Sequence, residues 1–195
     1  MSFRRLCVFC GSRDGVRPEY PAAARALGEE LARRGIGVVY GGGRLGLMGA
    51  VADAALAAGG TVIGVIPDAL RTRELAHSGL TELHVVPSMH ARKALMAELS
   101  DGFVALPGGY GTFEELLEIV TWAQLGIHAK PIGLLSVAGF FAPLRASWEH
   151  AAAEGFIMEE QRSLVVDAGS IPELLDRMST APRPTLAQWV LPEET

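Results

Sequence analysis

Residues 103–118, FVALPGGYGTFEELLE, contain the pattern that decides the fold of this chain. Four apolar residues, 103–106, are followed by Pro107 and by glycines at positions 108, 109 and 111, and apolar residues then recur at 113, 116, 117 and 120. This order predicts a strand, a glycine turn and a helix. The first backbone N–H groups of such a helix have no partner within it, and glycines let an anion approach them closely. We therefore expect this turn to bind an anion, phosphate above all.

The same residues also have a purely structural interpretation. Glycines in a turn between a strand and a helix can serve only to relieve backbone strain. Thr112 and Glu115 have the spacing of a capping box, in which the Glu side chain caps the start of its own helix. Glu115 is therefore a candidate for helix capping as well as for chemistry.

The size and composition of the chain fit a single globular domain. It has 195 residues, of which 49% are hydrophobic, enough for one well-filled domain and short for two. No apolar run approaches the roughly 18 residues of a membrane span. The N-terminal residues also lack the apolar segment of a secretory signal. We expect a cytoplasmic protein without a membrane partner.

The charges and cysteines argue against nucleic-acid, metal and redox functions. The net charge is −5 and the basic residues form no cluster, so no nucleic-acid partner is expected. Cys7 and Cys10 form one isolated C-x-x-C pattern inside an apolar run. Side chains three positions apart on a strand face opposite sides of the sheet, so these thiols are poorly placed to share a metal ion or a disulfide.

Short apolar segments that end at glycine or proline alternate with helical patterns along the chain. The expected strands are 6–10, 37–40, 61–66, 83–86, 103–106, 131–136 and 164–166. This alternation predicts an α/β fold, a single-domain, Rossmann-like, doubly wound parallel sheet with helices on both faces. We expect the domain to comprise residues 1–181 and to be followed by an irregular, proline-containing tail, 182–195.

Glycine clusters follow three of the expected strands, at Gly11, at 41–43 and at 108–111. Ligands of such sheets bind beyond the carboxyl ends of the strands, so the three clusters should meet at one rim. Residues 41–46 also match the G-x-G-x-x-G dinucleotide pattern. That pattern normally follows the first strand, whereas here it follows the second, and the acidic candidate Asp68 lies beyond a proline. A glycine loop that lines a nucleotide pocket fits these residues better than an NAD site.

Arg92 stands out on the helix that Ser88 is expected to cap. It shares a stripe with Leu95, Met96 and Leu99, at the spacing of residues that face a core. A guanidinium on an inward-facing stripe needs an anionic partner to offset its desolvation. That partner is either a carboxylate in a structural ion pair or a ligand. A further alternative is that the side chain extends to the rim of the core and keeps its charge in solvent.

Two neighbouring motifs, SMHARKALM (88–96) and PGGYGTFEE (107–115), resemble those of a known family. The segments CVFCGS (7–12), GGGRLGLMG (41–49) and TWAQLGIHAKPIGLL (121–135) are similar to the same family, and the likeness extends to about Asp167. The family is LONELY GUY, the cytokinin riboside 5′-monophosphate phosphoribohydrolases, whose members were often labelled lysine decarboxylases.

The resemblance implies hydrolysis of the N-glycosidic bond of a nucleoside 5′-monophosphate, with an N6-substituted adenine as its base, to free base and ribose 5-phosphate. Arg92 and Glu115 match the catalytic pair of the family. Its substrate-binding residues are matched by Glu74, Lys93, Gly109, Tyr110, Gly111, Thr112, Glu114 and Thr121. Residues 109–112 would hold the phosphate. The family is typically dimeric, and the resemblance implies no cofactor and no metal.

The residue types suit this chemistry. Breaking the bond between ribose C1′ and a base nitrogen builds positive charge on the sugar and negative charge on the base. Glu115 is able to stabilise the sugar cation or orient water, and Arg92 to stabilise negative charge or hold Glu115. The sequence leaves these assignments open, and it does not place the candidate base-pocket walls Met89, Met96, Trp122 and Leu125.

A second class of function is a non-catalytic carrier. Molybdenum cofactor carriers share the PGGxGT pattern and hold a phosphorylated ligand without cleaving it. The combination of Arg92, Lys93 and Glu115 at the family spacing favours the enzyme. Release of free base in proportion to time and enzyme, as opposed to stoichiometric binding, distinguishes the two.

Overall fold

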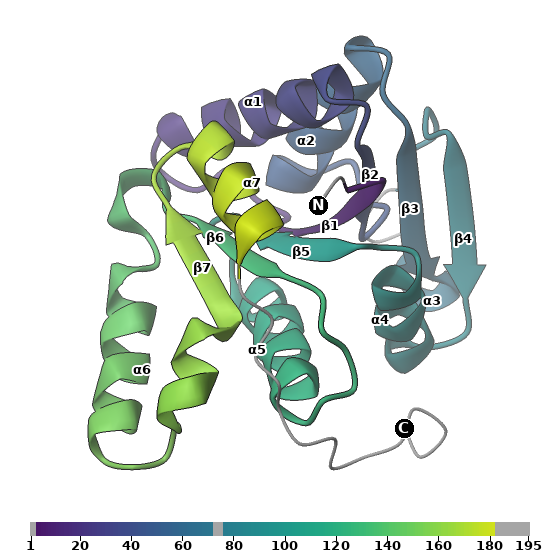
Figure 1. The fold of residues 1–195 in the computed structure, drawn as a ribbon. Coiled ribbons are helices and arrows are strands. Elements are labelled where there is room, and N and C mark those ends of the chain that lie inside the picture. The colour runs from purple at the N-terminus through teal and green to yellow at the C-terminus, as the bar shows by residue number, and fades with distance from the viewer. Residues whose placement is uncertain (1–2, 72–75, 182–195) are drawn as a thin grey trace.

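The computed structural model describes residues 3–71 and 76–181, and all structural statements refer to these residues. Seven strands form one sheet in the order β4-β3-β2-β1-β5-β6-β7, and every neighbouring pair is parallel (Figure 1). The strands are β1 Arg5–Phe9, β2 Gly37–Tyr40, β3 Val62–Pro67, β4 Glu82–Val86, β5 Gly102–Ala105, β6 Ile132–Leu135 and β7 Val165–Ala168.

The helices cover both faces of the sheet. They are α1 Glu19–Arg33, α2 Gly46–Ala57, α3 Asp68–Arg71, α4 Met89–Glu98, α5 Tyr110–Gln124, α6 Ala142–Ala153 and α7 Ile171–Thr180, with short 3-10 turns at η1 Val137–Gly139 and η2 Glu159–Leu164. Helices α1, α2 and α7 pack on one face, and α4, α5 and α6 lie on the other (Figure 1). The predicted α/β, Rossmann-like, doubly wound architecture is confirmed.

The strand sequences explain why the sheet is buried on both faces. β2, β3 and β5 are almost continuously apolar, and every residue of these three strands is buried. Alternate residues of β1 enter opposite cores, and Cys10 follows directly after the strand. Cys7 packs with the α4 and α5 side and Cys10 with the α1 and α2 side. The prediction that these two thiols face opposite sides is confirmed, and both are buried and unbridged.

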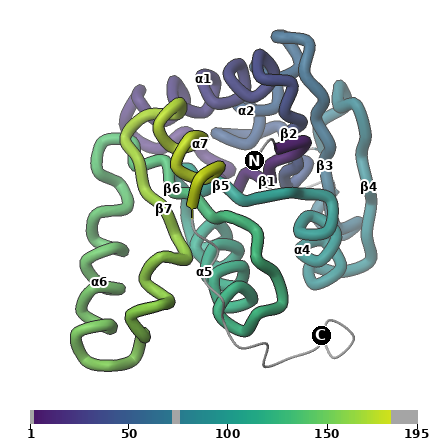
Figure 2. The backbone as a smooth tube through the Cα atoms, viewed as in Figure 1, coloured from purple at the N-terminus to yellow at the C-terminus, as the bar shows by residue number. Residues whose placement is uncertain are grey.

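The path of the chain creates a crevice at the centre of the sheet. From β1 the chain moves outward through β2 and β3 to β4, then returns to place β5 on the other side of β1 (Figure 2). The segments that leave β1 and β5 therefore turn to opposite faces of the sheet. Such a switch point leaves a space beyond the carboxyl ends of the two strands, where ligands of doubly wound folds bind.

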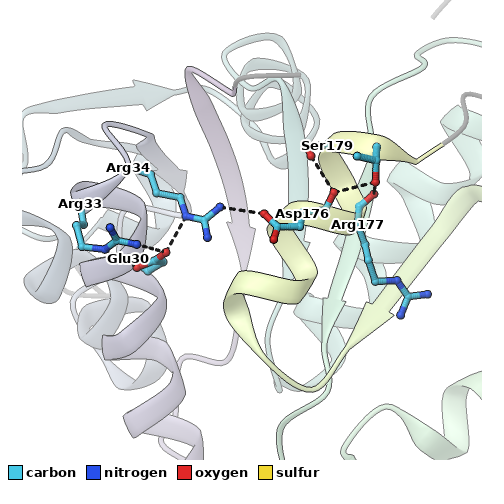
Figure 3. A network of polar contacts seen from close by, with 7 residues as sticks. Glu30, Arg33, Arg34, Asp176, Arg177 and Ser179 are labelled. Carbon is cyan, nitrogen blue, oxygen red and sulfur yellow. Dashed lines mark hydrogen bonds and ion pairs between the residues drawn. The ribbon is translucent and has the colours of Figure 1, made fainter.

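A polar network joins the first and last helices on one face of the sheet. Glu30 of α1 accepts hydrogen bonds from Arg33 and from Arg34, and Nη1 of Arg34 also lies 3.4 Å from Oδ1 of Asp176 in α7 (Figure 3). The hydrogen bonds from these two arginines lower the pKa of Glu30 to about 2. The contact between Arg34 and Asp176 links the C-terminal end of α1 to α7.

All seven expected strands are present, with shifts of at most two residues at their ends. After β3, residues Asp68–Arg71 form the single helical turn α3. The tail 182–195 lies outside the described residues. Within the described ranges, no helix has both the length and the apolar character needed to span a membrane.

The predicted capping box is wrong. Helix α5 begins at Tyr110 and its N-cap is Gly109, with no side-chain cap hydrogen bond. The helix therefore starts earlier than the box requires, so Thr112 lies in its first turn and Glu115 in its second. Thr112 is buried against the turn at Gly108 instead of capping the helix. Glu115 consequently has no capping role.

Candidate active site

A cavity of about 460 Å³ opens at the carboxyl ends of β1, β2 and β5. All three glycine clusters contribute to it, as predicted, through Gly11, Gly41 and residues 108–111. Its lining consists of Val8, Cys10, Gly11, Ser12, Arg13, Asp14, Gly15, Tyr20, Gly41, Leu47, Met48, Arg92, Pro107, Gly108, Gly109, Tyr110, Gly111, Thr112, Glu115 and Phe140. The topology of the sheet thus gathers residues from distant parts of the sequence around one space.

The turn between β5 and α5 has both packed and open glycines. A Cβ on Gly108 would overlap Oγ1 of Thr112 and lie 2.9 Å from the backbone nitrogen of Gly11. A Cβ on Gly109 or Gly111 would meet nothing within 4 Å. Gly108 therefore lets the turn pack against β1, whereas the other two glycines leave the backbone at the start of α5 accessible. The positive end of the helix dipole lies at the same accessible backbone. The turn is therefore suited to an anion.

The guanidinium of Arg92 forms part of the inner wall of the cavity. The residue is only 5% exposed, and its Nη2 donates a hydrogen bond of 3.0 Å to the carbonyl oxygen of Gly41. Its Nη1 lies 3.8 Å from the sulfur of Met89. A Cβ at position 41 would overlap Nη2, so only glycine leaves room for the guanidinium in this position. The inward-facing placement predicted for Arg92 is confirmed.

Glu115 lies on the cavity wall near Arg92. Burial raises the pKa of the Cys7 thiol, the charge of Glu115 raises it further, and the charge of Arg92 lowers it. Both charged groups therefore act on the same buried thiol from the α4 and α5 side of the sheet. Because Glu115 and Arg92 also line the same cavity, the structure brings an acid and a guanidinium to the space that the glycine turn lines.

Lys93 lies next to Arg92 in sequence but does not line the cavity. Its ammonium donates to Oε1 of Glu114 at 2.6 Å and to Oε1 of Glu118 at 2.8 Å. Burial by itself lowers the pKa of Lys93, but the two hydrogen bonds outweigh burial and raise the pKa. Lys93 is thus a charged link between α4 and α5, and its role in substrate binding, like that of Glu114, stays a prediction.

Thr121, another predicted substrate residue, is not among the residues that line the cavity. Thr121 is exposed, and its hydroxyl donates to the carbonyl oxygen of Leu117 in its own helix. Glu74 lies outside the described residues. Their roles stay predictions, while Gly109, Tyr110, Gly111 and Thr112 do line the cavity. Tyr110 is 96% exposed at its mouth, and Thr112 is buried at its base.

Several lining residues were missed by the reasoning from sequence. The segment after β1, Ser12 to Gly15, forms one wall, and its position just after a strand and a glycine was the signal that pointed to it. Tyr20 and Phe140 pack edge to face with ring centroids 5.9 Å apart and form another wall, for which the sequence carried no signal. None of the candidate base-pocket walls lines the cavity, and Met96 is buried in the core.

Comparisons with known proteins identify the family. A family model described as "Possible lysine decarboxylase" matches residues 48–178. The rice cytokinin riboside 5′-monophosphate phosphoribohydrolase LOG is 53% identical over 173 residues, which cover 89% of this chain and 72% of that protein. The chain belongs to the LONELY GUY family. Another relative, cytokinin riboside 5′-monophosphate phosphoribohydrolase LOG3 of Arabidopsis thaliana, is 52% identical over 90% of this chain and 82% of its own length.

The LONELY GUY chain also shares its fold with carrier proteins. The molybdenum cofactor carrier protein of Chlamydomonas reinhardtii superimposes with a TM-score of 0.69 at 21% identity, covering 91% of this chain and 96% of that chain. The molybdenum cofactor binding protein of Rippkaea orientalis gives a TM-score of 0.64 at 21% identity over 90% and 94% of the two chains. At these identities the likeness establishes the fold alone.

Proposed function

We propose that this protein hydrolyses the N-glycosidic bond of a nucleoside 5′-monophosphate and releases the free base and ribose 5-phosphate. The observation that carries the proposal is the position of Arg92 and Glu115 on the wall of the cavity that contains the anion-binding turn. The relatives at 52–53% identity are named as phosphoribohydrolases of cytokinin riboside 5′-monophosphates. A nucleotide with an N6-substituted adenine is the substrate that these names favour.

The two ends of the substrate have matching groups in the cavity. A 5′-phosphate fits the turn at residues 109–112, where the backbone is accessible at the positive end of α5. The ribose then lies toward Glu115, whose carboxylate stabilises positive charge at C1′ or orients the attacking water. Arg92, which is buried and lines the same cavity, stabilises negative charge that develops during cleavage, or holds Glu115 in place.

The apolar walls leave room for a base. Leu47 and Met48 of α2 and Phe140 contribute apolar surface to the cavity. Apolar walls are suited to a purine ring, and the volume of about 460 Å³ lies within the range typical of small-molecule sites. This arrangement supports a nucleotide as the ligand, and the choice between AMP and a prenylated adenine nucleotide is left to experiment.

Base release is the experiment that tests the proposal. Purified protein is incubated with AMP, with N6-isopentenyladenosine 5′-monophosphate and with the corresponding nucleosides, and free base is followed by chromatography. Release from the monophosphates, with little from the nucleosides, is the expected result because the nucleosides lack the group that the turn binds. Stoichiometric binding of the nucleotides without release of free base would contradict the proposed enzyme activity and favour a carrier function.

We also propose that the protein forms a homodimer in the cytoplasm, as the family resemblance and the sequence imply. Light scattering coupled to size-exclusion chromatography tests the dimer, since twice the chain mass of 20.7 kDa is expected. Elution at the mass of one chain would contradict it.

A further inference from the structure

His77 connects three parts of the rim of the sheet. Its backbone N–H donates to the carbonyl oxygen of Gly42 at 3.0 Å, and the preceding residue, Ala76, forms a bridge with Gly43. The ring Nδ1 accepts from the backbone N–H of Gly79 at 3.0 Å, and Nε2 lies 2.8 Å from Oδ1 of Asp53 in α2. The side chain is 10% exposed. One residue therefore holds segment 76–79, loop 41–43 and α2 together.

The hydrogen bonds determine which ring nitrogen carries the proton. A backbone N–H can only donate, so Nδ1 of His77 must be the acceptor for Gly79. The proton of the neutral ring is consequently on Nε2, from which it is donated to the carboxylate of Asp53. A side chain that accepts at one nitrogen and donates at the other is required to make both contacts.

The loop that His77 holds is also the loop that positions Arg92. The carbonyl oxygen of Gly41 accepts from Arg92, and that of the next residue, Gly42, accepts from His77. The loop is therefore bonded on one side to the guanidinium in the cavity and on the other to segment 76–79. Gly42 has φ +78, and a Cβ there would lie 3.2 Å from Cβ of Ile66, so the loop is closely packed as well.

We infer that His77 is a positioning residue for the proposed reaction. Its bond to Asp53 anchors segment 76–79 on α2, this segment holds loop 41–43 against the sheet, and the loop fixes the acceptor of the Arg92 guanidinium. The inference rests on the proposed function, because it requires that Arg92 takes part in the hydrolysis. His77 itself is not among the residues that line the cavity.

Two nearly isosteric substitutions separate the two ring contacts. In His77→Asn the amide retains an acceptor near the position of Nδ1 but does not reach Asp53. In His77→Gln the amide nitrogen is near the position of Nε2 and retains the donor for Asp53. A matched control is His84→Asn, because Nε2 of His84 also lies close to a carboxylate, 3.2 Å from Oε2 of Glu82, but on the edge strand β4.

Turnover of the nucleotide monophosphate is the first readout. We expect His77→Asn to lower kcat about 10-fold, within the range that small misplacements of catalytic groups produce, and His77→Gln to recover most of that loss. KM should change little because His77 is not among the residues that line the cavity. Asp53→Ala should match His77→Asn, and the double variant should be no slower than either single variant, since both remove the same link. His84→Asn should match the unsubstituted protein.

Hydrogen exchange is the second readout and does not depend on turnover. Amides of residues 41–43 should exchange faster in His77→Asn and in Asp53→Ala than in His84→Asn, because the link that holds the loop is lost. Unsubstituted protein that releases no base overturns the proposed function, and the exchange rates then decide the positioning inference. Two results would overturn the inference itself. One is a full kcat together with unchanged hydrogen exchange in His77→Asn. The other is a double variant of His77→Asn and Asp53→Ala in which the two losses in kcat add.

Discussion

The carbonyl oxygen of Gly41 accepts a hydrogen bond of 3.0 Å from Nη2 of Arg92, 51 residues further along the chain. The glycine loop after β2 and the helix after β4 thus meet inside the cavity. This contact gives Gly41 a reason to be glycine that the dinucleotide pattern of residues 41–46 does not supply. The contact also makes the position of the Arg92 guanidinium, in the helix after β4, depend on the backbone of the loop after β2.

Gly41→Ala should therefore impair catalysis by moving Arg92. The added Cβ would overlap Nη2 and lie 2.7 Å from Cε of Met48. We expect kcat/KM to fall by about 100-fold, the loss that a displacement of about 1 Å can cause. Steady-state kinetics of base release measure it. Gly169→Ala is the matched control, because a Cβ there would meet nothing within 4 Å, and equal kinetics for the two variants would argue against this role of Gly41.

Glu115→Gln separates chemistry from stability. Helix α5 is capped at Gly109 and not by Glu115, so the substitution removes no helix cap and the protein should remain folded. Loss of the carboxylate charge should lower kcat by about 100-fold or more, as expected for a group that acts as a general base or stabilises the sugar cation. Urea unfolding and turnover of the same preparation test both statements. Near-full turnover would remove Glu115 from the mechanism.

Lys93→Met should destabilise the junction between α4 and α5. The ammonium is buried and bonded to Glu114 and Glu118, and the second carboxylate oxygen of Glu118 has no hydrogen-bond partner among the described residues. Removing the cation leaves the partly buried carboxylate of Glu118 without its charge partner, which we expect to cost about 2 kcal/mol. Urea denaturation measures the loss. Adding Glu118→Gln to Lys93→Met should restore part of it, and an unchanged midpoint in the single variant would contradict the prediction.

His128 should make stability depend on pH below neutrality. Burial lowers its pKa, the hydrogen bond to the carbonyl oxygen of Ile119 opposes this, and Lys130 lowers the pKa further, to about 4 from 6.5. Between these values the unfolded chain binds more protons than the folded chain, so stability falls as the pH decreases from 6.5 toward 4. The full effect is at most about 3 kcal/mol.

The substitution His128→Gln isolates this contribution. The Gln amide keeps a donor for Ile119 but does not titrate, so its stability curve should be flatter between pH 6.5 and 4 than that of the unsubstituted protein. Chemical denaturation at a series of pH values gives the two curves. Parallel curves would show that His128 is not responsible for the dependence.

The sheet was predictable because its signals are local. Segments such as 37–40 and 103–106 are short and apolar and end at glycine or proline. The end of each buried strand could therefore be predicted from its own segment, without knowing which strands lie next to it. The convergence of the glycine clusters at one rim followed from the general behaviour of parallel sheets. The stripe that carries Arg92 was likewise visible from helical spacing, and its burial is confirmed.

The start of α5 and the partners of the charged residues were not predictable in this way. The spacing of Thr112 and Glu115 satisfies a capping box, but the helix begins at Tyr110. The turn before it packs through Gly108 against Gly11, which is a contact between distant segments. The hydrogen bonds of Lys93 to α5 and of His77 to α2 likewise depend on how the helices lie across the sheet.

The sequence by itself therefore determined the α/β class, the sites of the strands, the glycine turns and the family, because each follows from residue spacing within a short segment. Only the tertiary structure decided which groups meet: Arg92 with the carbonyl of Gly41, Lys93 with Glu114 and Glu118, and His77 with Asp53. The physical reason is that a hydrogen bond between segments tens of residues apart is set by packing across the sheet, on which local spacing has no bearing.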